Sequence, residues 1–487
     1  MTRPMLTLAA TGASLLLGAC AAFAPPVPMP ATDAPAMQTP AAWQAPPPPQ
    51  DAQAALRDWF SRFDDPLLLQ LIDAAQAASP TVAAAASRIE QARANSVAAD
   101  AVLLPALNAN ANASSGRTDL VTPRAGFATV NLQAGWELDL FGANRAGRDA
   151  AVARLQGAQA GWHDARIAIA AETAASYNAL RACQALVRIT DADTRSRAET
   201  ARVTELAANA GLFAPASAAL ARASAAQGRS LLAAQQAQCE LLFKALVALS
   251  ALDDPALREQ LELRHAQLPV PAGIAVRSVP AAALAQRPDL VAAGHQVVAA
   301  AEDTAQNQAL RYPSVAIAGS VGPAWLRVER MSTSGTLWTL GPLQVSLPLF
   351  DGGTRVANVV AARARYDEAV SAYQGLVRNA VREVESALIT LDSNARRVVD
   401  TQTAIEGFEA SLKAADARFR GGLGSLFDLE DARRSALLAN SALVELQRDR
   451  VAAWINLYRA LGGGWSPAES PTGSAADTLA AAPDATR

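Results

Sequence analysis

The chain has few of the side chains from which catalytic or metal centres are built. Its 487 residues include three cysteines and three histidines, which form no cluster with the spacing of metal ligands. No glycine-rich phosphate loop follows a strand-like segment, and no nucleophile elbow is present. We therefore expect no enzymatic activity, no metal ion and no bound cofactor.

Positive charge is not concentrated in any part of the chain. The formal net charge is −3, and the charged residues, 18% of the sequence, form no basic block. Binding to nucleic acid needs a cluster of lysine and arginine side chains. A nucleic-acid partner is therefore not expected.

The first twenty residues have the pattern of an export signal. Arg3 precedes an apolar stretch over residues 6–17, which is too short to span a bilayer. Leu-Gly-Ala-Cys at 17–20 resembles a bacterial lipobox, and the alternative is an ordinary cleavage site with an incidental cysteine. We expect residues 1–19 to be a lipoprotein signal peptide and Cys20 to carry a covalent lipid. The absence of aspartate after Cys20 favours transfer to the outer membrane.

Low-complexity segments lie on both sides of a long central region. Residues 20–50 are rich in proline and alanine with almost no charge, which predicts an unfolded, lipidated tether. Residues 466–487 are rich in alanine, serine and proline, which predicts a disordered tail. The region between them is long enough to form a large core.

The central region contains two copies of one pattern, at a spacing of about 210 residues. Strand-like segments and long helices recur in the same order, and the turn at Gly211-Leu212 corresponds to the turn at Gly422-Leu423. We expect a first repeat over residues 51–250, an inter-repeat linker over 251–280 and a second repeat over 281–465. Such a duplication predicts a protomer with pseudo-twofold symmetry.

Four segments alternate between apolar and polar residues with the period of a β-strand. They are residues 107–114, 130–140, 315–321 and 343–349. Each has about ten residues, which suits a tilted strand that crosses hydrocarbon; the alternative is a soluble sheet with one wet face. Four strands cannot close a barrel, and an open edge in lipid would leave backbone groups without hydrogen bonds. We therefore expect several protomers to share one barrel.

Two proline-free stretches, from Phe141 to Asn209 and from Asp351 to Phe419, predict helices of roughly 100 Å each. Apolar residues in the second stretch repeat every seven positions, as in a coiled coil. Each helix ends at a glycine turn, after which a second helix returns over residues 216–250 or 426–461. The pattern fits either a solvated coiled-coil rod or a helical barrel with a wet inner wall.

Cys183 and Cys239 lie equally far from Gly211, one on each arm of the first helical hairpin. In an antiparallel hairpin they would lie at the same height, and an exported protein meets oxidising conditions. We expect a disulfide between them; the alternative is two small residues buried in the coil.

Six short motifs add to these features. They are Trp136-Glu137-Leu138-Asp139-Leu140-Phe141-Gly142, Gln286-Arg287-Pro288-Asp289-Leu290, Leu349-Phe350-Asp351-Gly352-Gly353, Arg418-Phe419-Arg420-Gly421-Gly422, Asp428-Leu429-Glu430-Asp431-Ala432 and Tyr458-Arg459-Ala460-Leu461-Gly462-Gly463-Gly464-Trp465. Together they resemble the outer-membrane factor family of TolC-like channels, in the NodT-type lipoprotein branch that serves resistance-nodulation-division efflux systems.

The resemblance covers roughly residues 56–465 and implies an α-dominated membrane protein. In that fold three protomers form a twelve-stranded β-barrel with four strands each. The barrel continues as a twelve-helix coiled-coil tunnel, with a mixed α/β belt around its middle.

The resemblance also implies a gate at the periplasmic end. The family's Asp-x-x-Asp-Ala pattern falls on Asp428 and Asp431, which in three copies would form rings of negative charge. The alternative is helix capping, in which aspartate in the first turn meets the helix dipole. A basic residue common in this turn is absent, so the latch is expected to be weaker or to be formed by Arg418 and Arg420.

The implied function is that of the outer-membrane channel of a tripartite efflux system, which passively exports small toxic molecules. Expected partners are two further copies of the chain, a periplasmic adaptor (membrane fusion) protein, an inner-membrane resistance-nodulation-division pump and outer-membrane lipid. The residues expected to dock the adaptor are the hairpin tips Gly211, Leu212, Gly422, Leu423 and Ser425.

The expected location is the outer membrane of a Gram-negative bacterium, with a lipid anchor and an extension into the periplasm. One alternative function is the outer-membrane conduit of a type I protein secretion system, which shares the fold. A second is a structural coiled-coil lipoprotein without a pore, against which the four amphipathic strands argue.

Overall fold

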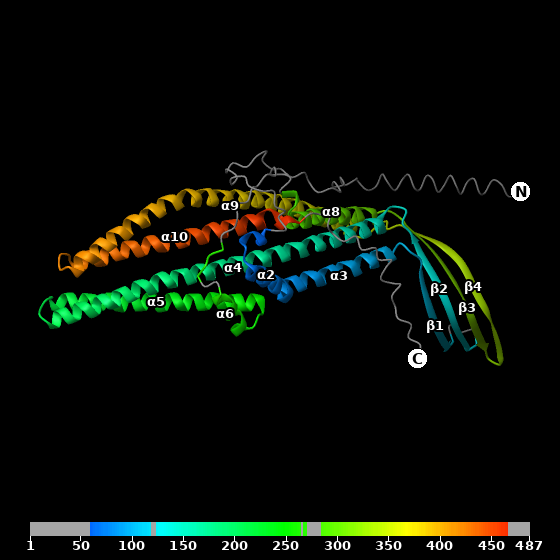
Figure 1. Ribbon diagram of the computed structural model, residues 1–487. Coiled ribbons are helices and arrows are strands. Elements are labelled where there is room, and N and C mark those ends of the chain that lie inside the picture. The colour runs from blue at the N-terminus through cyan, green and yellow to red at the C-terminus, as the bar shows by residue number, and fades with distance from the viewer. Residues whose placement is uncertain (1–58, 118–122, 264–265, 270–283, 466–487) are drawn as a thin grey trace. The chain divides into compact units, whose positions relative to one another are not determined.

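The protein is described by a computed structural model (Figure 1). The described residues are 59–117, 123–263, 266–269 and 284–465. The predicted signal peptide, Cys20, the tether and the C-terminal tail lie outside the described residues.

The chain divides into two compact units. The strand unit contains residues Ser87–Gln159 and Ala292–Gly375. The helical unit contains the described parts of Met37–Ala86, Ala160–Val291 and Leu376–Arg487. Within the described residues, no helix combines the length and the apolar character that crossing a membrane requires.

The order of elements occurs twice along the chain. The first copy consists of α3 (Pro80–Ala101), β1 (Ala106–Gly116), β2 (Ala125–Leu138), α4 (Ala143–Asn209) and α5 (Pro215–Ser250). The second consists of α8 (Pro288–Ala309), β3 (Ser314–Val328), β4 (Met331–Ser346), α9 (Thr354–Arg420) and α10 (Leu426–Ala460). Because α3 and α8 each have 22 residues and α4 and α9 each have 67, the structure agrees with the predicted duplication.

Short elements of the described chain also lie outside this repeated order. They are η2 (Phe60–Phe63), α2 (Pro66–Ala78), α6 (Asp254–Glu262) and η3 (Gly462–Gly464). Of these, α6 falls in the predicted inter-repeat linker, so that part of the segment is helical.

The four strands form one antiparallel sheet in the order β1-β2-β3-β4. β2 and β3 belong to different repeats, yet they pair from Ala125 opposite Val328 to Leu138 opposite Val315. This pairing joins the two repeats into a single sheet. Within the described chain, β1 and β4 are its edges.

The predicted strand bounds were partly wrong. The strands have 11, 14, 15 and 16 residues, so all are longer than expected. β2 ends before Leu140, whose amide turns back to donate to the carbonyl of Leu138 over 2.8 Å. β4 begins earlier than predicted and ends at Ser346, before Pro348, which has no N–H group for a ladder hydrogen bond.

The two faces of the sheet differ in polarity. Cross-strand partners such as Ala109, Leu132 and Val321 share one face, because opposite residues of an antiparallel pair point the same way. The exposed large residues of this apolar face are Leu107, Val130, Leu132, Trp136, Val321, Trp325, Trp338, Leu340, Leu343 and Val345. On the other face, Asn110 Nδ2 donates to Gln133 Oε1 over 3.2 Å. One face therefore suits lipid and the other suits water.

In the helical unit, α4 is followed by α5 and α9 by α10, and each pair forms a hairpin (Figure 1). Most positions of the seven-residue pattern predicted for α9 are buried, namely Val359, Tyr373, Val377, Ala380, Val384, Ala387 and Leu391. The remaining positions, Tyr366, Val370 and Val398, are half-buried. The coiled-coil interpretation of this segment is therefore confirmed.

The start of the second repeat is held by Arg287, which is buried. Its guanidinium donates to Asp289 Oδ2 over 2.7 Å and to Glu383 Oε2 over 2.8 Å. It also donates to the carbonyl of Ala460 over 3.2 Å. The Arg-Pro-Asp motif thus fastens the beginning of α8 to α9 and to the end of α10.

A disulfide joins the arms of the first helical hairpin. Cys183 on α4 and Cys239 on α5 are bonded, and their Cα atoms lie 5.6 Å apart. The pairing expected from their equal distance to Gly211 is present in the structure.

Replacing both residues, Cys183→Ser/Cys239→Ser, is expected to lower the free energy of unfolding by roughly 2–4 kcal/mol, because the cross-link restricts the unfolded chain. Chemical denaturation followed by circular dichroism measures the change. Reductant should shift the midpoint of the wild-type protein and leave that of the double variant in place. Two thiols that can be alkylated at these positions in unreduced native protein would contradict the bond.

Candidate functional site at the hairpin ends

The first helical hairpin turns through Gly211. Its φ is +76°, in the left-handed region that glycine adopts without strain. The amide of Leu212 donates to the carbonyl of Ala207 over 2.9 Å, which closes the end of α4. Pro215 lies in the first turn of α5, where its missing N–H leaves no helix hydrogen bond unmade.

The second hairpin has the same turn and a stronger helix cap. Gly422 has a φ of +72°, and the amide of Leu423 donates to the carbonyl of Arg418 over 2.8 Å. Ser425 Oγ accepts a hydrogen bond from the amide of Asp428 over 3.1 Å. In return, the amide of Ser425 donates to Asp428 Oδ2 over 3.4 Å, which completes a capping box.

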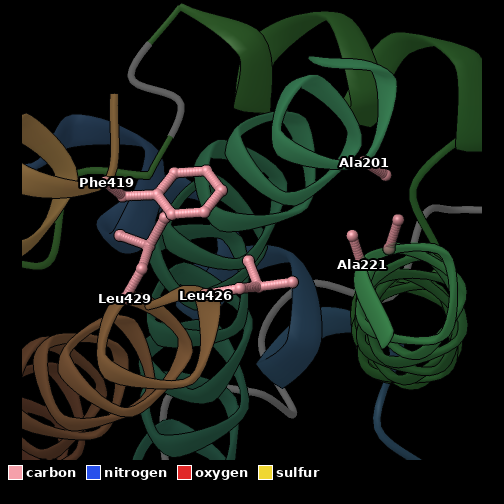
Figure 2. Packing of buried hydrophobic residues seen from close by; sticks show 6 residues of the cluster. Ala201, Ala221, Phe419, Leu426 and Leu429 are labelled. Carbon is pink, nitrogen blue, oxygen red and sulfur yellow. The ribbon is translucent and has the colours of Figure 1, made fainter. Parts of the chain in front are cut away.

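An apolar cluster joins the two hairpins near their turns (Figure 2). It consists of Ala201, Ala221, Ala225, Phe419, Leu426 and Leu429, with Phe213, Leu412 and Ala415 packed against it. The rings of Phe213 and Phe419 lie 5.8 Å apart and connect the first turn to the end of α9. Alanines of α4 and α5 leave room that larger side chains of α9 and α10 fill.

A polar cluster centred on Glu430 also links α10 to the first hairpin. Arg197 on α4 donates to Glu430 Oε2 over 3.0 Å, and Ser224 Oγ on α5 lies 2.6 Å from the same oxygen. Arg197 is held in turn by Asp193, with Nε 2.7 Å from Oδ2. One carboxylate thus connects three helices. We call Asp193, Arg197, Ser224, Glu430 and Arg433 the Glu430 cluster.

Arg433 completes this cluster from the seam of α10. It is 3% exposed, and its Nη1 donates to Glu430 Oε1 over 2.6 Å. Its Nη2 donates to Ser196 Oγ and Thr200 Oγ1 on α4, each over 3.0 Å. These hydrogen bonds and the carboxylate of Glu430 compensate the cost of burying the Arg433 guanidinium. Removing the carboxylate would leave the positive charge of Arg433 buried and uncompensated.

The predicted gate residues lie on the opposite side of α10 from its seam. Leu426, Leu429 and Arg433 are buried, whereas Asp428 and Asp431 are exposed. Asp431 forms an ion pair with Arg434 one turn further along the helix. The capping interpretation therefore applies to Asp428 within one protomer, while both carboxylates remain on an outward surface.

The expected latch arginines are not joined to the gate aspartates. Arg420 Nε lies 2.9 Å from Asp416 Oδ2 on its own helix. Arg418 is exposed and forms no ion pair with a described residue. Within one protomer, the Glu430 cluster connects the hairpins instead.

The tips of both hairpins present large apolar side chains to solvent. Leu212 is 77% exposed and Leu423 is 79% exposed. Phe427, in the first turn of α10, is 72% exposed. Side chains of this kind suit a surface that another protein covers.

Sequence reasoning did not identify Arg197, Ser224 or Arg433 as functional residues. One signal was available, because Arg433 lies seven residues after Leu426 and four after Leu429, at a coiled-coil seam position. A charged residue at such a position predicts a buried partner. Nothing in the local sequence identified that partner as Glu430.

Comparisons with known proteins agree with this architecture. The sequence model described as outer membrane efflux protein matches residues 71–252 and 279–463. Outer membrane protein OprJ of Pseudomonas aeruginosa is 30% identical over 483 residues, which cover 96% of this chain and 98% of that protein. Nodulation protein T of Rhizobium leguminosarum bv. viciae is 28% identical over 88% of each chain. The solved outer-membrane channel OprN aligns with a TM-score of 0.79 and 26% identity, covering 89% of this chain and 100% of that one.

Replacing Glu430→Gln is expected to loosen the hairpin ends, because Arg197 and Arg433 lose the carboxylate that compensates them. Hydrogen exchange of the amides in residues 418–426 should become about tenfold faster or more. The matched control is Glu199→Gln, which breaks an exposed pair with Arg202 on the same helix as Arg197. Equal exchange rates in the two variants would mean that the cluster does not hold the hairpins together.

Proposed function

Because the chain belongs to the outer membrane efflux protein family, we propose that it forms the outer-membrane channel through which an efflux pump expels small molecules. One observation carries this proposal: a four-stranded sheet with one exposed apolar face is joined to helices of 67 residues. The strands suit a membrane, and the helices suit a conduit that extends beyond it.

The channel is a homotrimer. A sheet of four strands has two open edges, β1 and β4, whose backbone groups need partners in hydrocarbon. Pairing β4 of one copy with β1 of the next satisfies both edges. Three copies supply twelve strands, enough to close a barrel around a water-filled lumen.

The chain has a lipid anchor and a docking surface for a partner protein. A covalent lipid on Cys20 holds the N-terminus at the membrane. The exposed leucines at the hairpin tips contact a periplasmic adaptor protein, which connects the channel to an inner-membrane pump of the resistance-nodulation-division type. The matching family is described as efflux, which favours this role over a conduit for protein secretion.

The gate lies where three second hairpins converge. There Asp428 and Asp431, exposed on each α10, form rings of negative charge that favour cations. Repulsion between the carboxylates opposes closure, and the Glu430 cluster opposes opening because it fastens each α10 to α4. A cavity of about 410 Å³ lies beside this cluster and is lined by Arg197, Glu430, Asp431 and other residues.

Neutralising the gate with Asp428→Asn/Asp431→Asn is expected to lower conductance several-fold and to reduce cation selectivity, because the rings lose the charge that attracts cations and opposes closure. The amide groups keep the shape of the original side chains. The new side chain at position 428 also retains an oxygen that can accept a hydrogen bond from the backbone N–H of Ser425. Planar-bilayer recording of the purified protein measures both quantities.

The control is Ser425→Ala, which removes the serine cap and keeps both carboxylates. It should leave selectivity unchanged. Equal changes in the control and the double variant would assign the aspartates to helix capping. If wild type, the double variant and Glu430→Gln all fail to conduct, the channel proposal is wrong.

A further inference from the structure

The two ends of the sheet connect to different structures. At one end the strands lead into helices, at Ala106, Leu138, Ser314 and Ser346. At the other end, β3 turns into β4 through Glu329 and Arg330, and residues 117–124 join β1 to β2. In the proposed channel the helices extend into the periplasm, so this second end, the outer end, lies at the cell exterior.

Arg327 lies on the apolar face at the outer end. It pairs with Gly126, and the adjacent pair on the same face is Trp325 with Ala128. A Cβ atom built on Gly126 would lie 3.9 Å from the Cβ of Arg327, which places both on one side of the sheet. The arginine is exposed.

Arg124 lies beside the pair formed by Gly126 and Arg327. Its Nε donates to Ser115 Oγ over 3.3 Å, and Ser115 pairs with Gly126. On the other side of the row, Arg327 pairs with Ser332. The outer row therefore consists of Ser115, Gly126, Arg327 and Ser332, with the guanidinium of Arg124 attached to it.

Two of the three exposed tryptophans on the apolar face lie near its ends, and the third, Trp338 opposite Val321, lies between them. Trp325 lies two residues inward from Arg327, and Trp136 lies opposite Ile317, near the helix-connected end. The distance from Trp325 to Ile317 is roughly 26 Å along the strand and about 20 Å along the membrane normal after tilting. Aromatic girdles border the apolar band of outer-membrane barrels at this scale. The outer row is therefore at the depth of lipid headgroups.

Among the described residues, charge at the outer end is positive; Asp119, in the same connection between β1 and β2, lies outside them. The described residues there include Arg117, Arg124, Arg327 and Arg330, against a single carboxylate at Glu329. None of the four arginines forms an ion pair with a described residue. Guanidinium groups bind phosphate bidentately, so exposed arginines at headgroup depth are complementary to a phosphorylated lipid.

We propose that the outer row with Arg124 and Arg327 binds the phosphate groups of lipid A, the phosphorylated glycolipid of the outer leaflet. The guanidiniums contact a sugar phosphate, and the hydroxyls of Ser115 and Ser332 donate to its remaining oxygens. The acyl chains lie along the apolar face below Trp325. The proposal rests on the outer-membrane location and is independent of the gate.

The test is binding of lipid A to delipidated protein in detergent, measured by native mass spectrometry. Bis-phosphorylated lipid A, monophosphorylated lipid A and phosphatidylglycerol are titrated separately. Wild type should bind the bis-phosphorylated form most tightly. Arg124→Gln/Arg327→Gln should lower its affinity about tenfold or more, because charge-assisted hydrogen bonds to phosphate are lost.

Two further variants make the result specific. Arg124→Lys/Arg327→Lys keeps the charge but loses the bidentate geometry, so its affinity should fall between those of wild type and the glutamine variant. Arg330→Gln removes one positive charge from the turn beside the row and should bind within about twofold of wild type. Glutamine variants that bind as tightly as wild type would overturn the proposal, as would equal affinity for phosphatidylglycerol. Conductance in bilayers without lipid A tests the channel separately.

Discussion

Backbone hydrogen bonding in hydrocarbon is the constraint on which the architecture depends. A strand edge in lipid has no water to satisfy its N–H and C=O groups, so every edge must find another strand. Pairing of β2 with β3 satisfies two edges within the chain by joining the two repeats. In the proposed trimer, the edges at β1 and β4 pair with neighbouring copies, so a chain with four strands can contribute to a closed barrel. The outward apolar face and its arginines at the outer end follow from the same sheet, since period-two alternation places them on one side.

The helical unit is governed by a different requirement, which is close packing with a limited number of specific contacts. Alanine lets α4 and α5 approach closely, and a seam of larger residues organises α9. Arg433 lies in the buried seam of α10, and Glu430 compensates its charge. Removing one partner of a buried pair of this kind is destabilising, because the other charge is left uncompensated.

The two repeats have kept the same backbone and diverged in chemistry. Both hairpins turn through a glycine in the left-handed region, and both long helices have 67 residues. Only the second hairpin carries Asp428 and Asp431, since the first has Ser217 and Leu220 where they would fall. The first hairpin instead carries the disulfide and the basic partner Arg197. In the proposed channel one hairpin thus bears the gate charge and the other provides a fixed support.

Local patterns in the sequence were sufficient to predict the helices and strands. They were also sufficient to predict contacts between residues equally far from a hairpin turn. Strand alternation, the seven-residue seam and the glycine turns reflect interactions among neighbouring residues, and equal spacing about Gly211 was enough to pair Cys183 with Cys239. Strand ends and the Glu430 cluster were decided only by the tertiary structure. Arg197 and Glu430 are 233 residues apart, and their meeting depends on how each helix is rotated about its axis. That rotation is set by the packing of whole hairpins, so no short stretch of sequence contains it.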